Sequence, residues 1–200
     1  MIETIEFTAV IAAALFGVIL ATRHQMDAVG VVTISFAVSF GGGTLRDLFL
    51  DRTPLFWIGQ DHYAVTVFCI AIVGALIPHV VSKMERFLHV PDAIGMGLFS
   101  ITGAAFALEE GTSMFIAVIL GTVTGTFGGV IGDIICNQVP SLFRTTPLCA
   151  TCAFAGAWCY VLMVGFVDKS IAMVVGAAVI VVMRLVAIKW NICLPAPKTT

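Results

Sequence analysis

The chain has 200 residues, of which 60% are hydrophobic and 11% charged, with a net charge of −2 and a mean hydropathy of +1.07. Soluble domains carry about 25% charged residues, so this composition excludes a soluble fold and indicates a membrane protein. No block of basic residues is present, which argues against nucleic acid as a partner.

Seven apolar segments are long enough to be predicted as membrane-spanning helices, because crossing the hydrocarbon core takes about 20 mostly apolar residues. The first carries Glu3 and Glu6 in place of basic residues, so we expect a retained span rather than a cleaved signal. The sequence therefore predicts an all-α polytopic membrane protein with one transmembrane domain over residues 1–200. The predicted spans are 4–21, 28–48, 62–81, 92–108, 112–135, 147–167 and 170–189.

Charged residues are distributed unevenly between the two sides that seven spans create. One side holds the basic residues Arg23, Lys83, Arg86, Arg144, Arg184, Lys189 and Lys198. The other holds Arg46, Arg52 and Lys169 together with the acids Glu3, Glu6, Asp51, Asp61, Glu109, Glu110 and Asp168. Cytoplasmic loops are enriched in Lys and Arg, so we predict an external N-terminus and a cytoplasmic C-terminus.

A spaced pattern of small residues that ends in aspartate occurs twice, 86 positions apart. The first copy is Ser35, Ser39, Gly43 and Asp47, and the second is Gly121, Gly125, Gly129 and Asp133. The copies lie in the second and fifth predicted spans, so an odd number of spans separates them and the halves run in opposite directions. This predicts an inverted repeat of three plus three helices, residues 4–86 and 92–168, followed by a seventh helix at 170–189. Transporters use such repeats to build a path near the membrane midplane.

The two aspartates are the first functional candidates, because a carboxylate in lipid is costly unless it faces protein or water. Glycine weakens a helix interior by roughly 1 kcal/mol relative to alanine, so we expect the second and fifth helices to be broken at their glycines. Carbonyls freed there would face a water-filled path and replace part of a cation's hydration shell. These expected breaks are at Gly41, Gly42, Gly43, Gly128 and Gly129.

Hydroxyl groups near the expected breaks are weak, reversible oxygen ligands that suit a monovalent cation. The candidates are Ser35, Ser39, Thr44, Thr122 and Thr126. An alternative interpretation is structural. Small residues four apart form a packing face between helices, and serine or threonine hydroxyls bond back to helix carbonyls.

Arg46 breaks the symmetry between the halves, because Gly132 occupies the equivalent position. Adjacent helical residues point about 100° apart, so Arg46 need not pair with Asp47. Three roles remain open: a gate, a counter-ion for a carboxylate of the other half such as Asp133, or an anchor that reaches the membrane interface.

Other chemistry has little support in the sequence. Cys149 and Cys152 have the spacing of a metal or redox pair, but no second pair or histidine cluster accompanies them, so we expect them to pack helices. We expect no cofactor and no metal site. No nucleophile–base set or phosphate loop is present, so an enzyme is the least expected class.

The string from Gly41 to Asp47, GGGTLRD, with Gly128, Gly129 and Asp133 echoing it, resembles the prokaryotic trimeric intracellular cation (TRIC) channels. That sequence family also contains proteins described as glycine transporters. The resemblance implies a homotrimer in the prokaryotic inner (plasma) membrane. It also implies one pore per protomer, lined by the second and fifth helices and kinked at the glycines. Potassium, and less selectively sodium, would be the permeant ions, and Arg46, Asp47 and Asp133 the matching polar positions.

Three functional hypotheses follow. The first is a channel permeable to potassium and sodium, with membrane lipids and further copies of the chain as its partners. The second is a secondary transporter for a small zwitterion such as glycine, whose charged groups would bind at broken helix ends. The third is a membrane scaffold in which the carboxylates lie exposed at helix ends.

Overall fold

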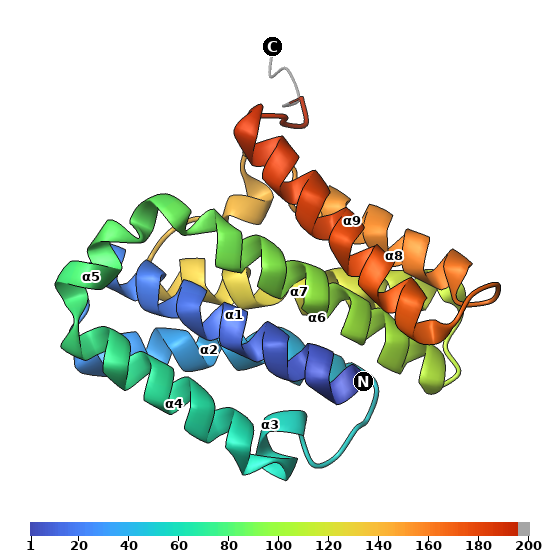
Figure 1. The fold of residues 1–200 in the computed structure, drawn as a ribbon, viewed down its shortest axis with the longest axis horizontal. Helices are drawn as coiled ribbons and strands as arrows, with labels where there is room; N and C mark the ends of the chain where they lie inside the picture. The colour runs from blue at the N-terminus through green and yellow to red at the C-terminus, as the bar shows by residue number, and fades with distance from the viewer. Residues whose placement is uncertain (196–200) are drawn as a thin grey trace.

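The computed structural model describes residues 1–195 as an all-helical protein (Figure 1), and Lys198 lies outside the described residues. The helices are α1 (Ile2–Arg23), α2 (Ala28–Phe49), α3 (Phe56–Gly59), α4 (Asp61–Leu76), α5 (Pro78–Lys83), α6 (His89–Glu109), α7 (Met114–Ile135), α8 (Ala150–Met163) and α9 (Lys169–Lys189). Two short 3-10 helices, η1 (Glu85–Phe87) and η2 (Ser141–Phe143), lie in the connections.

Five of the helical segments are long and apolar enough to cross a membrane: α1, α2, α6 with its preceding turn, α7 and α9. The other two predicted spans correspond to shorter apolar helices, because α4 has 16 residues and α8 has 14. The predicted span 62–81 is divided at Pro78, which begins α5. Proline lacks an N–H donor and disfavours a helical conformation of the residue before it, so a new helix starts there.

The prediction that the glycine-rich helices are broken is wrong. Both α2 and α7 run without interruption for 22 residues. Their glycines lie where the two helices cross. A Cβ atom on Gly42 would lie 2.1 Å from the carbonyl oxygen of Thr124, and one on Gly128 would lie 2.4 Å from that of Val38. The backbone of the partner helix fills the space beside these glycines, and this close packing offsets their low helix propensity.

These two contacts are exchanged by the 86-residue shift, which takes Gly42 to Gly128 and Val38 to Thr124. Such an exchange is what a pseudo-two-fold axis between antiparallel helices produces. The ends of the helices repeat in the same register. Asp27 caps α2 by accepting from the Gly30 N–H, and Ser113 caps α7 by accepting from the Ile116 N–H. Beyond the C-termini, Asp51 and Asn137 both have a positive φ, of 52° and 56°.

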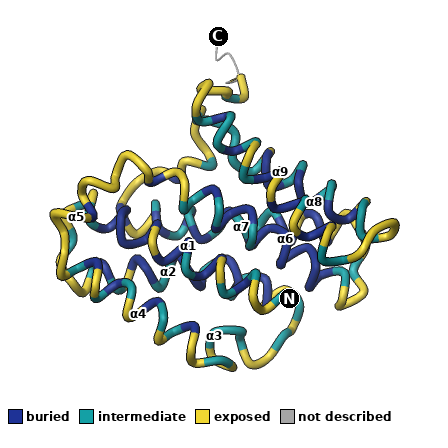
Figure 2. The backbone as a smooth tube through the Cα atoms, viewed as in Figure 1, coloured by how far each residue is buried: buried dark blue, intermediate teal, exposed yellow. Residues whose placement is uncertain are grey.

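Two helix groups flank the central helices. Figure 1 shows α4 beside α1 and α2, and α8 and α9 on the opposite flank beside α6 and α7. Figure 2 shows burial concentrated along α1, α6 and α7, whereas the outer faces are exposed. Much of that outer face is apolar, including Phe68, Leu76, Phe166 and Val182. Such a surface suits contact with lipid rather than water. At the start of α9, Asp168 accepts from the Ser170 N–H, which lowers the pKa of its carboxyl.

Candidate functional site

A buried ion cluster lies at the C-terminal end of α2. The Arg46 side chain is fully buried, and its Nη1 donates to Glu6 Oε1 of α1 at 2.5 Å. Its Nε donates to Asp47 Oδ1 at 2.8 Å, and its Nη2 lies 2.7 Å from the same oxygen. Glu6 and Asp47 are themselves buried, with residue exposures of 4% and 1%. One guanidinium thus holds two carboxylates, which is the arrangement that makes a buried charge tolerable.

Aromatic rings enclose this cluster. The Arg46 guanidinium carbon lies 4.5 Å from the centre of the Phe106 ring of α6 and 5.2 Å from that of Phe56 of α3. The second carboxylate oxygen of Asp47 accepts from the Phe56 N–H at 2.9 Å, so Asp47 also fixes the start of α3. Arg52, which is partly exposed, lies 4.0 Å from Asp47, and its guanidinium carbon lies 4.0 Å from the centre of the Phe106 ring.

The structure corrects two sequence-based expectations about these residues. Arg46 does pair with its neighbour Asp47, because its long side chain folds back along the helix end. The pairing of Arg46 with Asp133 is wrong. Arg46 contacts Glu6 near the start of α1, whereas Asp133 lines a cavity beside the other end of α1. Glu6, expected on the external surface, is instead a buried partner of Arg46. One signal in the sequence could have found it: Glu6 stands 86 positions before another acid, Asp92.

A cavity of 670 Å³ opens beside the buried cluster. We call it the Arg46 cavity. Acidic groups outnumber basic ones on its wall, an arrangement that attracts cations. Its charged lining residues are Glu3, Glu6, Arg46, Asp51, Arg52 and Glu110.

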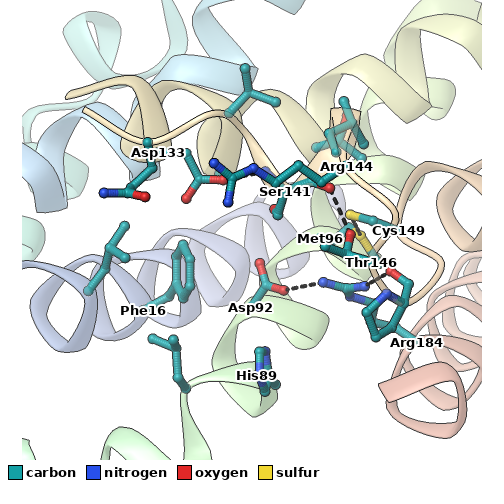
Figure 3. Close-up of a pocket in the computed structure, with 18 of the residues that line it drawn as sticks. Phe16, His89, Asp92, Met96, Asp133, Ser141, Arg144, Thr146, Cys149 and Arg184 are labelled. Carbon is teal, nitrogen blue, oxygen red and sulfur yellow. Dashed lines mark hydrogen bonds and ion pairs between the residues drawn. The ribbon is translucent and has the colours of Figure 1, made fainter. Parts of the chain in front are cut away.

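A second cavity, of 430 Å³, lies at the opposite end of α1, beside Leu20 and Arg23. We call it the Arg184 cavity. Figure 3 shows Asp92 of α6 beside Arg184 of α9, and Asp133 on the facing helix. Arg184 Nη2 donates to Asp92 Oδ2 at 3.3 Å, and its Nη1 donates to the carbonyl oxygens of Pro147 and Leu148 at 2.7 and 2.9 Å.

Asp133 repeats the local geometry of Asp47. Its Oδ2 accepts from the Ser141 N–H at 2.8 Å, just as Asp47 accepts from the Phe56 N–H at 2.9 Å. Each aspartate therefore caps the short helix that follows its own long helix. Among residues 1–195, Asp133 has no ion pair within 4 Å, and it lines the Arg184 cavity together with Arg23, Arg144 and Arg184.

A small pocket of 20 Å³ lies beside the α2–α7 crossing, next to the Arg184 cavity, with which it shares lining residues. Its walls include Val38, Phe99, Gly128 and Gly129. Gly129 and Thr126 also line the Arg184 cavity, so these two predicted site residues lie next to open space. Gly41 and Gly43 instead pack, against Ile131 and the Phe56 ring.

The predicted hydroxyl ligands divide into two groups. Thr122 and Thr126 donate to carbonyls one turn earlier in α7, at 2.8 and 2.7 Å, and Thr44 accepts from Trp57 Nε1 at 3.0 Å. Ser35 and Ser39 are fully buried, and their hydroxyls have no hydrogen-bond partner among the described residues. A hydroxyl that donates keeps its oxygen lone pairs, so both groups retain atoms that can bind a cation.

A family model and several membrane proteins are similar to this chain in sequence. A family model described as "Glycine transporter" matches residues 3–79 and again residues 89–165, and the two matches are offset by the same 86 positions. The UPF0126 membrane protein of Vibrio cholerae is 35% identical over 186 residues, covering 91% of this chain and 77% of that protein. The UPF0126 inner membrane protein YadS of Escherichia coli is 32% identical over 188 residues, covering 91% and 89%.

Solved structures agree with the family match. The TRIC trimeric intracellular cation channel orthologue from Rhodobacter sphaeroides superposes with a TM-score of 0.89 and 31% identity, covering 96% of this chain and 98% of that one. A second TRIC cation channel superposes with a TM-score of 0.90 and 29% identity, covering 99% and 98%. The resemblance to TRIC channels is therefore confirmed. The chain belongs to the membrane-protein family described by the glycine transporter model, which includes the UPF0126 proteins and shares the TRIC channel fold.

Proposed function

We propose that this protein is a membrane channel for monovalent cations, permeable to potassium and to sodium. The observation that carries the proposal is the placement of buried or cavity-facing carboxylates at both ends of the α2–α7 crossing. Glu6 and Asp47 lie at one end, and Asp92 and Asp133 at the other. The close superposition on TRIC cation channels supports it.

The conducting path runs from the Arg46 cavity, past the crossing of α2 and α7, into the Arg184 cavity. We take the arrangement at the crossing, where the open space beside Gly128 and Gly129 is 20 Å³, as the closed state of this path. The unpartnered hydroxyls of Ser35 and Ser39 are candidate oxygen ligands on the buried face of α2, where Ser35 packs against Gly17 of α1. Opening requires α2 and α7 to separate, and the ion pairs of Arg46 hold one end shut.

In the membrane, α4 and α8 complete the count of seven spans, because each is apolar although shorter than the other five. The antiparallel crossing and the two matches of the family model support an inverted 3+3 repeat with α9 as the added seventh helix. The basic end, which contains Arg23, Arg144 and Arg184, faces the cytoplasm, and the N-terminus lies outside. The name of the Rhodobacter relative supports a homotrimer.

A second candidate function is transport of a small zwitterion such as glycine. The Arg184 cavity favours it, because arginine and aspartate side chains line the same space and match the two charges of an amino acid. The description of the matching family model points the same way.

Flux into proteoliposomes of the purified protein separates the two functions. We expect potassium flux without glycine, a several-fold lower flux for Asp47→Asn, and no change for Asp61→Asn. Asp61 is the matched control because it is an exposed aspartate that lines neither cavity. Saturable uptake of labelled glycine without independent potassium flux would establish the transporter instead. The absence of both fluxes from folded protein would leave the scaffold hypothesis.

A further inference from the structure

The 86-residue shift relates the acidic residues of one end to those of the other, but it gives Arg46 no basic counterpart. Glu6 of α1 corresponds to Asp92 of α6, and Asp47 corresponds to Asp133. Arg46, which binds both acids of the first pair, corresponds to Gly132. The second half therefore carries the same two carboxylates and lacks the guanidinium that neutralises them.

Arg184 of α9 supplies a guanidinium at that place from outside both repeats. Its side chain is only 8% exposed, and its Nη2 lies 3.3 Å from Asp92 Oδ2. The two bonds from its Nη1 to the carbonyls of Pro147 and Leu148 fix its direction. Its Nε has no hydrogen-bond partner among the described residues, so part of the guanidinium remains unused beside the cavity.

The two ends nevertheless differ in how much charge they leave uncovered. Arg46 contacts both acids of its end, whereas Arg184 contacts Asp92 and, within the described residues, forms no ion pair with Asp133. Asp133 thus faces the Arg184 cavity as the uncovered carboxylate. Asp92 is masked by Arg184, although 20% of its side chain is exposed and it lines the same cavity.

We infer that Arg184 of α9 determines cation selectivity at its end of the path. Its guanidinium neutralises the Asp92 carboxylate and so sets how strongly that carboxylate attracts permeating ions. This inference rests on the proposed channel function. Masked by Arg184, Asp92 contributes little to the field in the cavity. Without Arg184, the Asp92 charge is no longer neutralised, and the cavity, which Arg23 and Arg144 also line, becomes less positive and attracts cations more strongly. Without Asp92, the guanidinium repels cations, since close charges in a partly buried site are weakly screened.

The test is the reversal potential of purified channels in planar bilayers under a potassium chloride gradient. We expect Arg184→Gln to shift the reversal potential toward the potassium equilibrium potential and Asp92→Asn to shift it away. The double variant, whose pair is again neutral, should return toward the wild-type value. Lys189→Gln is the matched control, because Lys189 lies on the same helix and is exposed.

The opposite directions of the two shifts separate an electrostatic role from a structural one. If the pair only holds α9 in place, both single variants should have lower thermal stability but an unchanged reversal potential. That result would overturn the inference. If Arg184→Gln does not fold, Asp92→Asn decides alone through the direction of its shift. Wild-type protein without potassium current would instead refute the proposed channel, independently of Arg184.

Discussion

At the scale of single residues, the clearest feature is a guanidinium that is fully buried between two carboxylates. Arg46 has a side-chain exposure of 0%, and Glu6 and Asp47 have 5% and 2%. Removing such charges from water costs several kcal/mol per ion, so their mutual contacts must offset a large penalty. The cluster holds together α1, α2 and, through the Phe56 N–H, α3.

Arg46→Gln should therefore lower the free energy of unfolding in detergent by roughly 3–5 kcal/mol, because it leaves two buried carboxylates without their counter-ion. Arg52→Gln should change it by about 0–1 kcal/mol, since Arg52 is partly exposed and its ion pairs lie near the surface. Adding Glu6→Gln to Arg46→Gln should restore part of the loss by removing one of the two acids. Equal stability of Arg46→Gln and wild type would show that the cluster does not stabilise the fold.

The sequence predicted some members of the charged sites and missed others for an identifiable reason. Asp47 and Asp133 were found because each ends a repeated pattern within one helix. Glu6 and Arg184 were missed because their partners, Arg46 and Asp92, lie 40 and 92 residues away and meet them only in the fold. The 86-residue separation of Glu6 and Asp92 can be seen in the sequence, but it is informative only once the fold shows which arginine each acid contacts.

At the scale of elements, the crossing of α2 and α7 shows where helix propensity misleads. Glycine-rich segments are weak as isolated helices, so the sequence favoured broken spans. In the fold, Gly42 and Gly128 let the two backbones approach closely, and each helix remains continuous. The competing interpretation of the four-apart motif as a packing face is confirmed at Gly121 and Gly125, which lie against the backbone of α6, whereas Gly129 borders open space.

Alanine substitutions at packed glycines and at glycines beside open space should therefore have different effects on stability. Gly42→Ala places a Cβ atom 2.1 Å from the Thr124 carbonyl oxygen, so the helices must move apart. We expect a loss of about 1–3 kcal/mol in the free energy of unfolding, the usual range for overpacking. Gly129→Ala meets nothing within 4 Å and should leave stability unchanged or raise it by up to about 1 kcal/mol through helix propensity. Equal thermal stability of the two variants in detergent would contradict this division.

At the scale of the whole molecule, charged cavities open at opposite ends of α1, one with mainly acidic lining and the other with three arginines beside two aspartates. The antiparallel crossing places Asp47 at one end and Asp133 at the other, and the same local capping recurs at each. Five of the seven predicted spans are long helices, whereas the predicted spans 62–81 and 147–167 contain shorter ones. Hydropathy alone could not show this, because an apolar stretch does not reveal where proline or loop packing ends the helix.

We propose that this molecule conducts cations passively along the α2–α7 crossing. The most direct measurement is current through planar bilayers that contain the purified wild-type protein, under a potassium chloride gradient and without glycine. We expect unitary currents whose reversal potential lies between zero and the potassium equilibrium potential, because carboxylates line both ends of the path. Protein that is folded and reconstituted but gives no current, while taking up glycine saturably, would contradict it.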